Sequence, residues 1–144
     1  MTRPRRSDPL ALVEALYSAL RHGDVPALRS LLDPGFTGRL TPGLPWSLGR
    51  RPIEGAEAML RDGWGVVARE FELGAFPEES FVVDDVVVVR GTYRGRARTS
   101  GRPIDAWFVH IWRVRSSRFV ELRQVTDSAV WWSSLEPFRE DVDS

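Results

Sequence analysis

Residues 102–115 read RPIDAWFVHIWRVR, a long run rich in aromatic and β-branched side chains that predicts a β-strand. After it, the pair Ser116-Ser117 predicts a tight turn, and residues 119–126 predict the last strand. Before it, residues 81–93 predict two more strands joined by a turn at Asp84-Asp85. The second half of the chain therefore predicts an antiparallel meander.

The first half of the chain shows helical periodicity instead. Asp8 and Pro9 form a capping residue and a first-turn proline, and apolar residues then recur at helical spacing up to Gly23. Asp24 can cap a second helix, which we expect to end at Asp33 because a proline follows it. We expect a short strand at 36–40, a loop at 41–49 and a third helix from about residue 55. The apolar positions of this third helix are Ala56, Met59, Leu60, Val67 and Phe71. Helices followed by a meander predict an α+β domain with the helices on one face of the sheet.

Composition restricts the class of protein. The 144 residues suit a single domain, with its core at about 8–133 and flexible termini. All 20 basic residues are arginine and the 20 acidic residues balance them, which argues against nucleic acid as a partner. Cysteine is absent, which excludes disulfides and thiolate chemistry and fits the cytoplasm. No run is long and apolar enough to predict a membrane partner.

Three segments together are similar to a known family. Residues 15–36, ALYSALRHGDVPALRSLLDPGF, resemble the opening helix pair of SnoaL-like and ketosteroid-isomerase-like proteins of the nuclear-transport-factor-2-like superfamily. Residues 101–115 resemble the penultimate long strand of those proteins, and residues 118–127 resemble the strand that ends their cone. The resemblance implies a strongly bent sheet wrapped around a helix, an apolar cavity between them, and a homodimer formed through the outer face of the sheet.

His110 is the first candidate for catalysis. Alternation along the strand places it on one face with Phe108 and Trp112, while Trp107 and Val109 lie on the other. The resemblance implies that this face is concave and that related enzymes carry an acidic catalytic residue at this position. A histidine in an apolar pocket can exchange a proton near neutral pH. The alternative is a buried histidine whose ring nitrogens are satisfied by neighbours.

Gln124 is the second candidate. If it shares the concave face with Leu122 and Thr126, its amide points into the cavity, where it can bind a carbonyl group or orient water. Epoxide hydrolases of this fold carry an acid at a similar position, so the glutamine argues against that activity. The alternative is a structural hydrogen bond.

Arg39 stands where the resemblance implies the base carboxylate of ketosteroid isomerases. No Asp or Glu occurs from residue 35 to residue 51, which argues against true ketosteroid isomerase chemistry. Arg39 can hold an anionic group, or it is a solvated loop residue. Tyr17 and Tyr93 can place hydroxyl groups near the cavity, or they belong to the core.

The chain has six tryptophans. Trp46, Trp64 and Trp112 can line an aromatic pocket or its lid, which suits a flat apolar ligand. The competing interpretation is core packing. In that interpretation the remaining three tryptophans lie at a dimer face: Trp107, Trp131 and Trp132. We expect some tryptophans in each role.

Other polar residues have structural interpretations. Asp127 can cap a closing helix, and Asp105 is expected to be a surface charge. Arg94, Arg96 and Arg98 alternate, which predicts a solvated edge strand that discourages strand addition. With two histidines on different elements and no cysteine, neither a metal nor another cofactor is expected.

Two functions remain open at this point. The first is a cofactor-free acid–base enzyme, an isomerase, cyclase or dehydrating lyase, acting on a hydrophobic substrate that contains a carbonyl group. The second is a ligand-binding or dimerisation domain without catalysis. An open cavity facing His110 favours the enzyme, whereas a His110 held by internal hydrogen bonds favours the binding domain.

Overall fold

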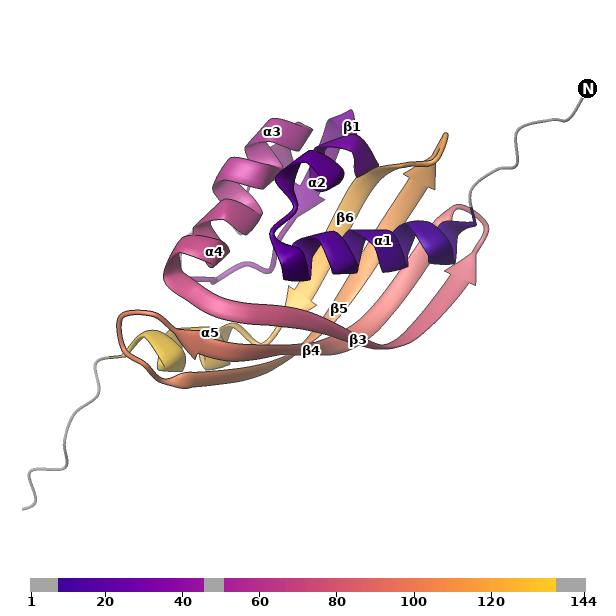
Figure 1. Ribbon diagram of the computed structural model, residues 1–144. Helices are drawn as coiled ribbons and strands as arrows, with labels where there is room; N and C mark the ends of the chain where they lie inside the picture. The colour runs from indigo at the N-terminus through magenta and orange to yellow at the C-terminus, as the bar shows by residue number, and fades with distance from the viewer. Residues whose placement is uncertain (1–7, 46–50, 137–144) are drawn as a thin grey trace, which may run out of the picture.

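The computed structural model describes residues 8–45 and 51–136. Their core is one sheet with the strand order β2-β1-β6-β5-β4-β3 and the N-terminal helices over one of its faces (Figure 1). The four long strands form the predicted meander: β3 (Phe71–Val83), β4 (Val86–Ala97), β5 (Pro103–Arg115) and β6 (Arg118–Thr126). The α+β class is confirmed. The prediction of Trp46 as a pocket residue and that of flexible termini lie outside the described residues.

The N-terminal helices start and stop at the predicted signals. In α1 (Pro9–His22) the Asp8 side chain accepts a hydrogen bond from the Leu10 amide, and Gly23 ends the helix in a left-handed conformation with φ 64°. Asp24 caps α2 (Val25–Leu31) through the amide of Ala27. These local rules are obeyed because the caps satisfy amide groups that the first turn leaves free.

The segment after α2 differs from the prediction. The helix already ends at Leu31, and β1 (Leu32–Arg39) contains Asp33 and Pro34, so the strand begins four residues earlier than expected. Strand β1 pairs in parallel with β6 and antiparallel with the short β2 (Ile53–Glu54). Proline is tolerated there because the β1–β6 register is interrupted between Leu32 and Thr37.

The third helical segment is continuous but not uniform. It runs through α3 (Ala56–Ala58), the π-helical stretch η2 (Met59–Trp64) and α4 (Gly65–Glu70). Phe71 was predicted on this helix, and that prediction is wrong. It has extended backbone angles and begins β3, ten residues before the predicted strand. Its buried side chain nevertheless reaches the same core, which is why helical spacing included it.

The arginine-rich strand is not an edge. Strand β4 lies between β3 and β5, so the prediction of a solvated edge at Arg94, Arg96 and Arg98 is wrong. These side chains are exposed. Arg94 lies directly opposite the exposed Asp105 of β5, an opposite-charge pair that suits two neighbouring inner strands.

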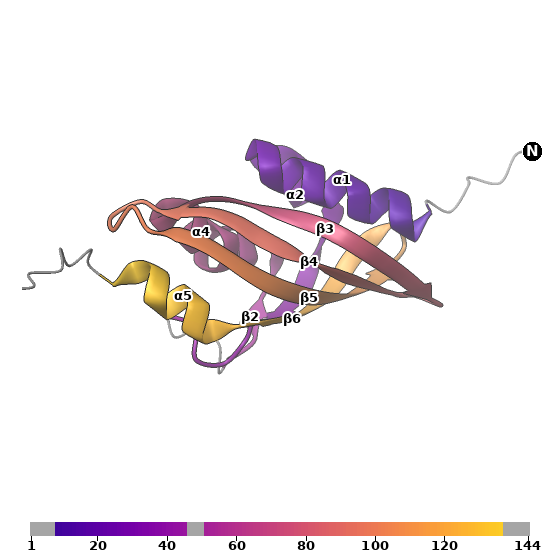
Figure 2. The ribbon, with the colours of Figure 1, turned by 90° about the horizontal axis from the view of Figure 1, so that it is seen from below.

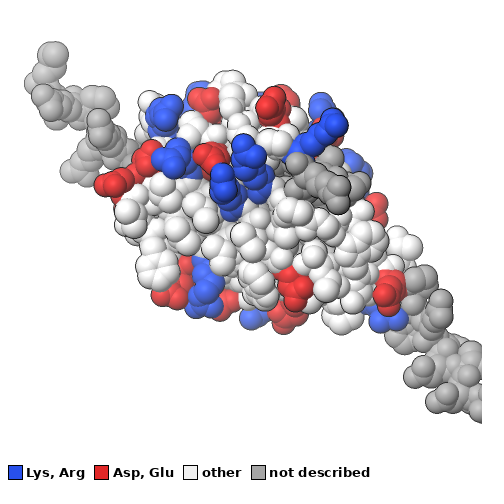
Figure 3. All heavy atoms as spheres, turned by 180° about the vertical axis from the view of Figure 1, so that it is seen from behind, with Lys and Arg blue, Asp and Glu red and all other residues white. Residues whose placement is uncertain are grey.

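The sheet has one covered and one uncovered face. Figure 2 shows α1 and α2 on one side of the bent sheet. Phe108, His110 and Trp112 are buried toward that side, as alternation predicted, while Trp107 on the opposite side is 49% exposed. The uncovered face, seen in Figure 3, has a broad uncharged middle bordered by charged groups.

The last helix, α5 (Ser128–Leu135), closes the end of the domain near the β4–β5 turn (Figures 1 and 2). Asp127 caps it by accepting from the Ala129 amide, which confirms its structural role. Trp131 is buried against the rings of Phe71 and Tyr93, so placing it at a dimer face was wrong. Within the described helices, none has the length and apolarity needed to cross a bilayer.

Candidate functional site

A cavity of about 180 Å³ lies between the helices and the inner face of the sheet. Leu20 of α1, Leu28 of α2 and Val67 of α4 form one side of its wall. Strand β3 contributes Leu73 and Ala75. None of the described residues that line the cavity is an Asp, Glu, Lys or Arg. The cavity therefore suits an uncharged, largely apolar ligand.

Three side chains supply most of the polarity of the wall: Tyr93, His110 and Gln124. They come from three neighbouring strands. His110 of β5 lies directly opposite Gln124 of β6 in the antiparallel register, and Val89 of β4 lies opposite His110 on the other side. Tyr93 follows Val89 by four residues and so shares its face. The meander itself thus brings these groups together.

His110 is held at both ring nitrogens. The hydroxyl of Tyr17, which comes from α1, lies 2.6 Å from Nδ1, and the hydroxyl of Tyr93 lies 2.5 Å from Nε2. The Phe108 ring stacks on the imidazole with a centroid distance of 4.0 Å. The imidazole therefore has little freedom to rotate. This geometry matches the alternative interpretation of His110, a buried histidine whose ring nitrogens are both hydrogen-bonded to neighbours.

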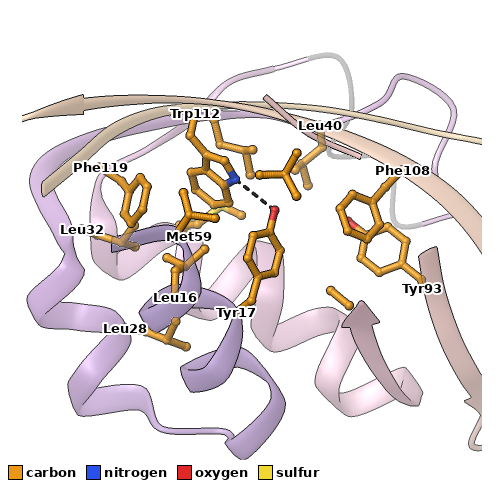
Figure 4. Close-up of a cluster of buried hydrophobic side chains, with 14 of the residues drawn as sticks. Leu16, Tyr17, Leu28, Leu32, Leu40, Met59, Tyr93, Phe108, Trp112 and Phe119 are labelled. Carbon is orange, nitrogen blue, oxygen red and sulfur yellow. Dashed lines mark hydrogen bonds between the residues drawn. The ribbon is translucent and has the colours of Figure 1, made fainter. Parts of the chain in front are cut away.

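The hydrogen bonds continue on both sides of the histidine. The Trp112 indole N–H donates to the Tyr17 hydroxyl at 3.1 Å, the contact drawn in Figure 4. On the other side the Gln124 amide Nε2 donates to the Tyr93 hydroxyl at 2.7 Å. We call these five residues the polar network: Trp112, Tyr17, His110, Tyr93 and Gln124.

Burial keeps every titratable member of the polar network neutral. Desolvation lowers the pKa of His110 from 6.5 to about 3, because the surroundings disfavour the imidazolium. Desolvation likewise raises the pKa of Tyr93, although the Gln124 hydrogen bond works against this effect. Burial raises the pKa of Tyr17 well above 10. At neutral pH the network therefore contains hydroxyl groups and one neutral imidazole.

The direction of the hydrogen bonds follows from counting donors. A neutral imidazole carries one N–H, so it donates to one tyrosine and accepts from the other. Suppose that it donated to Tyr17. That oxygen, which already accepts from Trp112, would keep an unused hydrogen in a fully buried position, at a cost of about 1–3 kcal/mol. The favoured arrangement has Tyr17 donating to Nδ1 and Nε2–H donating to Tyr93.

This arrangement leaves the hydroxyl hydrogen of Tyr93 free. The oxygen of Tyr93 accepts from both His110 and Gln124, and its ring lines the cavity. Its own hydrogen can therefore be donated to an acceptor in the cavity. The arrangement can polarise a carbonyl group, with the neutral imidazole holding the phenol in place.

The other predicted site residues lie in different places. Trp64 lines the cavity, as do Tyr93, His110 and Gln124. Phe108, Trp112 and Tyr17 form a buried layer behind the wall. Leu122 is core, and the Thr126 hydroxyl pairs with the carbonyl oxygen of Trp107 and the indole of Trp131.

Arg39 is not among the described residues that line the cavity, so its expected role in substrate binding stays a prediction. It is exposed on β1 directly opposite Arg123 of β6, in a separate surface groove that Arg51 also lines. Gln124, which lines the cavity, borders this groove as well.

Sequence reasoning missed parts of the cavity wall on β3 and α5. Leu73 and Ala75 fall in a segment to which no strand was assigned, and Trp131 was placed on the surface. For Leu20 and Leu28 the helical spacing gave the necessary signal. Across 8–45 and 51–136, no three His, Asp or Glu side chains cluster closely enough to hold a metal ion.

The sequence matches the family model of the SnoaL-like domain over residues 13–122, and the chain belongs to that family. Solved structures confirm the nuclear-transport-factor-2-like fold. One is a protein of unknown function from Burkholderia pseudomallei, with 26% identity, TM-score 0.81, and coverage of 90% of this chain and 98% of that one. No curated protein matches the sequence.

Two further structures have names that bear on function. IdmH from Streptomyces antibioticus, provisionally assigned as a polyketide cyclase, is 25% identical, with TM-score 0.77 and coverage of 89% of this chain and 98% of that one. TerC, crystallised with polyporic acid, is 20% identical, with TM-score 0.78 and coverage of 88% and 96%. The likeness to TerC concerns the fold alone.

Proposed function

We propose that this protein is a cofactor-free enzyme that promotes enolisation of a hydrophobic, uncharged substrate containing a carbonyl group. The observation that carries the proposal is the position of the Tyr93 hydroxyl, which contacts His110 Nε2 and Gln124 Nε2 beside an apolar cavity. With the hydrogen-bond directions assigned above, its hydrogen is left for an acceptor in the cavity. A preorganised donor in an apolar, low-dielectric site stabilises developing negative charge on oxygen far better than bulk water does.

The role of His110 differs from the one expected from sequence. Both of its ring nitrogens are occupied and its pKa is lowered to about 3, so it is unsuited to act as a free base near neutral pH. We assign it a positioning role: it fixes the orientation of the Tyr93 hydroxyl. Tyr93 is the group that contacts the substrate oxygen.

The chemistry balances with water as the base. Water removes the proton next to the carbonyl group, the C–H electron pair forms the C=C bond, and the carbonyl π pair moves to the oxygen that Tyr93 stabilises. Return of a proton to another carbon gives isomerisation, attack of the enol carbon on a second carbonyl gives cyclisation, and loss of a β-hydroxyl gives dehydration. The proposed enol is common to all three reactions, and the name of IdmH favours cyclisation.

A second candidate function has its own observation. His110 is held by two tyrosines and the described lining contains no carboxylate, which favours a ligand-binding or dimerisation domain without catalysis. In that case the polar network would only recognise the ligand.

Hydrogen exchange into a model ketone tests the proposal. We expect the protein to accelerate deuterium incorporation next to the carbonyl group of 2-tetralone in D₂O, followed by NMR. Tyr93→Phe should lower the protein-catalysed rate by about 10²–10³. Arg39→Gln, which changes a residue outside the cavity, should keep the wild-type rate.

Two outcomes would count against the proposal, the first against catalysis and the second against the role of Tyr93. One is binding of 2-tetralone with exchange no faster than in buffer, which would support the binding domain. The other is full exchange by a folded Tyr93→Phe variant.

A further inference from the structure

The side chain of Gln124 is only half satisfied. Its Nε2 donates to Tyr93 at 2.7 Å, whereas its Oε1 is buried and lacks a hydrogen-bond partner among the described residues. Buried amide oxygens are nearly always paired, because leaving one without a donor costs the hydration that it loses. The unpaired oxygen therefore needs an explanation.

The position of Gln124 indicates where the missing donor comes from. The residue lies on the cavity side of β6, opposite His110, and it lines the cavity. Its partner across the strand pair is already saturated by two tyrosine hydroxyls. Gln124 also borders the groove that Arg39 lines, but its amide is bonded to Tyr93 of the cavity wall, so an occupant of the cavity can supply a hydrogen to Oε1.

The wall thus offers a donor next to an acceptor. Tyr93 presents a free hydroxyl hydrogen, and the adjacent Gln124 presents a free carbonyl oxygen; the 2.7 Å hydrogen bond between the two side chains keeps them together. A matching ligand carries an acceptor beside a donor. A charged ligand group is disfavoured as this acceptor or donor, because the described lining contains no Asp, Glu, Lys or Arg to pair with it.

We propose that the cavity selects uncharged hydroxycarbonyl compounds, in which a hydroxyl or enol O–H lies next to the carbonyl group. The carbonyl oxygen accepts from Tyr93 and the hydroxyl donates to Gln124 Oε1. This inference rests on the proposed function for the orientation of the Tyr93 hydroxyl, and it adds the substrate class. Gln124 is then a specificity-determining residue.

Three related probes test this selection: 2-hydroxy-1-tetralone, its methyl ether 2-methoxy-1-tetralone, and 1-tetralone. All are neutral and of similar shape, and only the first has a hydroxyl hydrogen. Calorimetric titration, supported by fluorescence of Trp64 and Trp131 in the cavity wall, measures their affinities. We expect the hydroxyketone to bind about threefold to tenfold more tightly than either other probe, as one net hydrogen bond provides.

Variants assign the preference to its residue. Gln124→Met has a similar shape without the amide, and should bind all three probes alike. Arg39→Met, an exposed control on the neighbouring strand, should keep the wild-type preference. If Gln124→Met fails to fold, the wild-type comparison of the three probes decides alone. Equal affinity of the wild-type protein for the hydroxyketone and its methyl ether would overturn the inference.

The binding preference for the hydroxyketone and the catalysis of hydrogen exchange can fail independently of each other. A hydroxyl preference without ketone exchange would overturn the proposed enzyme and leave the selection standing. Exchange that depends on Tyr93, without any hydroxyl preference, would overturn the selection and leave the enzyme standing.

Discussion

The burial of His110 makes the stability of the protein depend on pH in a specific way. The pKa of this histidine is lowered from 6.5 to about 3 because the imidazole is desolvated. Between these two pH values the unfolded chain carries a proton on His110 that the folded protein does not. Unfolding therefore takes up a proton, and the stability present above pH 6.5 is lost as the pH falls toward 3.

The size of this effect follows from the linkage. Each pH unit between 6.5 and 3 costs about 1.4 kcal/mol, so His110 should reduce the free energy of unfolding by about 2 kcal/mol between pH 8 and pH 5. Urea denaturation followed by tryptophan fluorescence at pH 8, 7, 6 and 5 measures this change in the free energy of unfolding. Carboxylates contribute in the same range, so the quantity that matters is the difference between wild type and His110→Gln.

His110→Gln should have a pH dependence of stability that is shallower by this amount. His22→Gln, which removes an exposed histidine from the end of α1, is the matched control and should follow the wild type. If the curves of the wild type and His110→Gln run parallel from pH 8 to pH 5, the imidazole is not buried in its neutral form. The hydrogen-bond directions assigned to the polar network would then be wrong.

Three further predictions concern stability and assembly. Tyr17→Phe removes the acceptor of the Trp112 indole and should lower the free energy of unfolding by about 1–3 kcal/mol in urea; an unchanged midpoint would contradict the network. Gly91→Ala should destabilise by at least about 1–3 kcal/mol on thermal or chemical unfolding, because the added methyl group would lie 2.5 Å from the Phe108 ring; wild-type stability would contradict this packing. We propose that the uncharged outer face pairs two copies, so light scattering should show a dimer that Trp107→Arg converts to a monomer; a monomeric wild type would refute the pairing.

Local rules predicted the helices and the meander because their signals are local. Asp8, Gly23 and Asp24 act on their own turns, and alternation along β5 depends on backbone geometry alone. The parallel pairing of β1 with β6 joins segments about 85 residues apart, such as Arg39 and Arg123. No pattern within either segment specifies that partner, so the early start of β1 was missed.

The candidate site was predictable only where local signals determine it. Alternation grouped His110 with Phe108 and Trp112, and the family resemblance implied that this face is concave; Gln124 was expected there on the condition that Leu122 and Thr126 share the face. The direct opposition of His110 and Gln124 follows from the short turn between their strands. The contact of Tyr17 with His110 depends on how α1 crosses the sheet, which is a packing result. Trp131 was misplaced because a helix of eight residues with two adjacent tryptophans does not indicate which of them faces inward.

The polar network argues for function because stability alone does not require it. A buried cluster of this kind adds little stability relative to well-packed apolar side chains, and here it makes the protein more sensitive to acid. A domain that only needed a core, or only a dimer face, could place leucine at 110 and 124 without leaving Gln124 Oε1 unpaired. The network instead ends at the cavity wall, with a donor and an acceptor both unused. Unused hydrogen-bonding groups at the wall of an apolar cavity are what recognition or catalysis of a small molecule in that cavity requires.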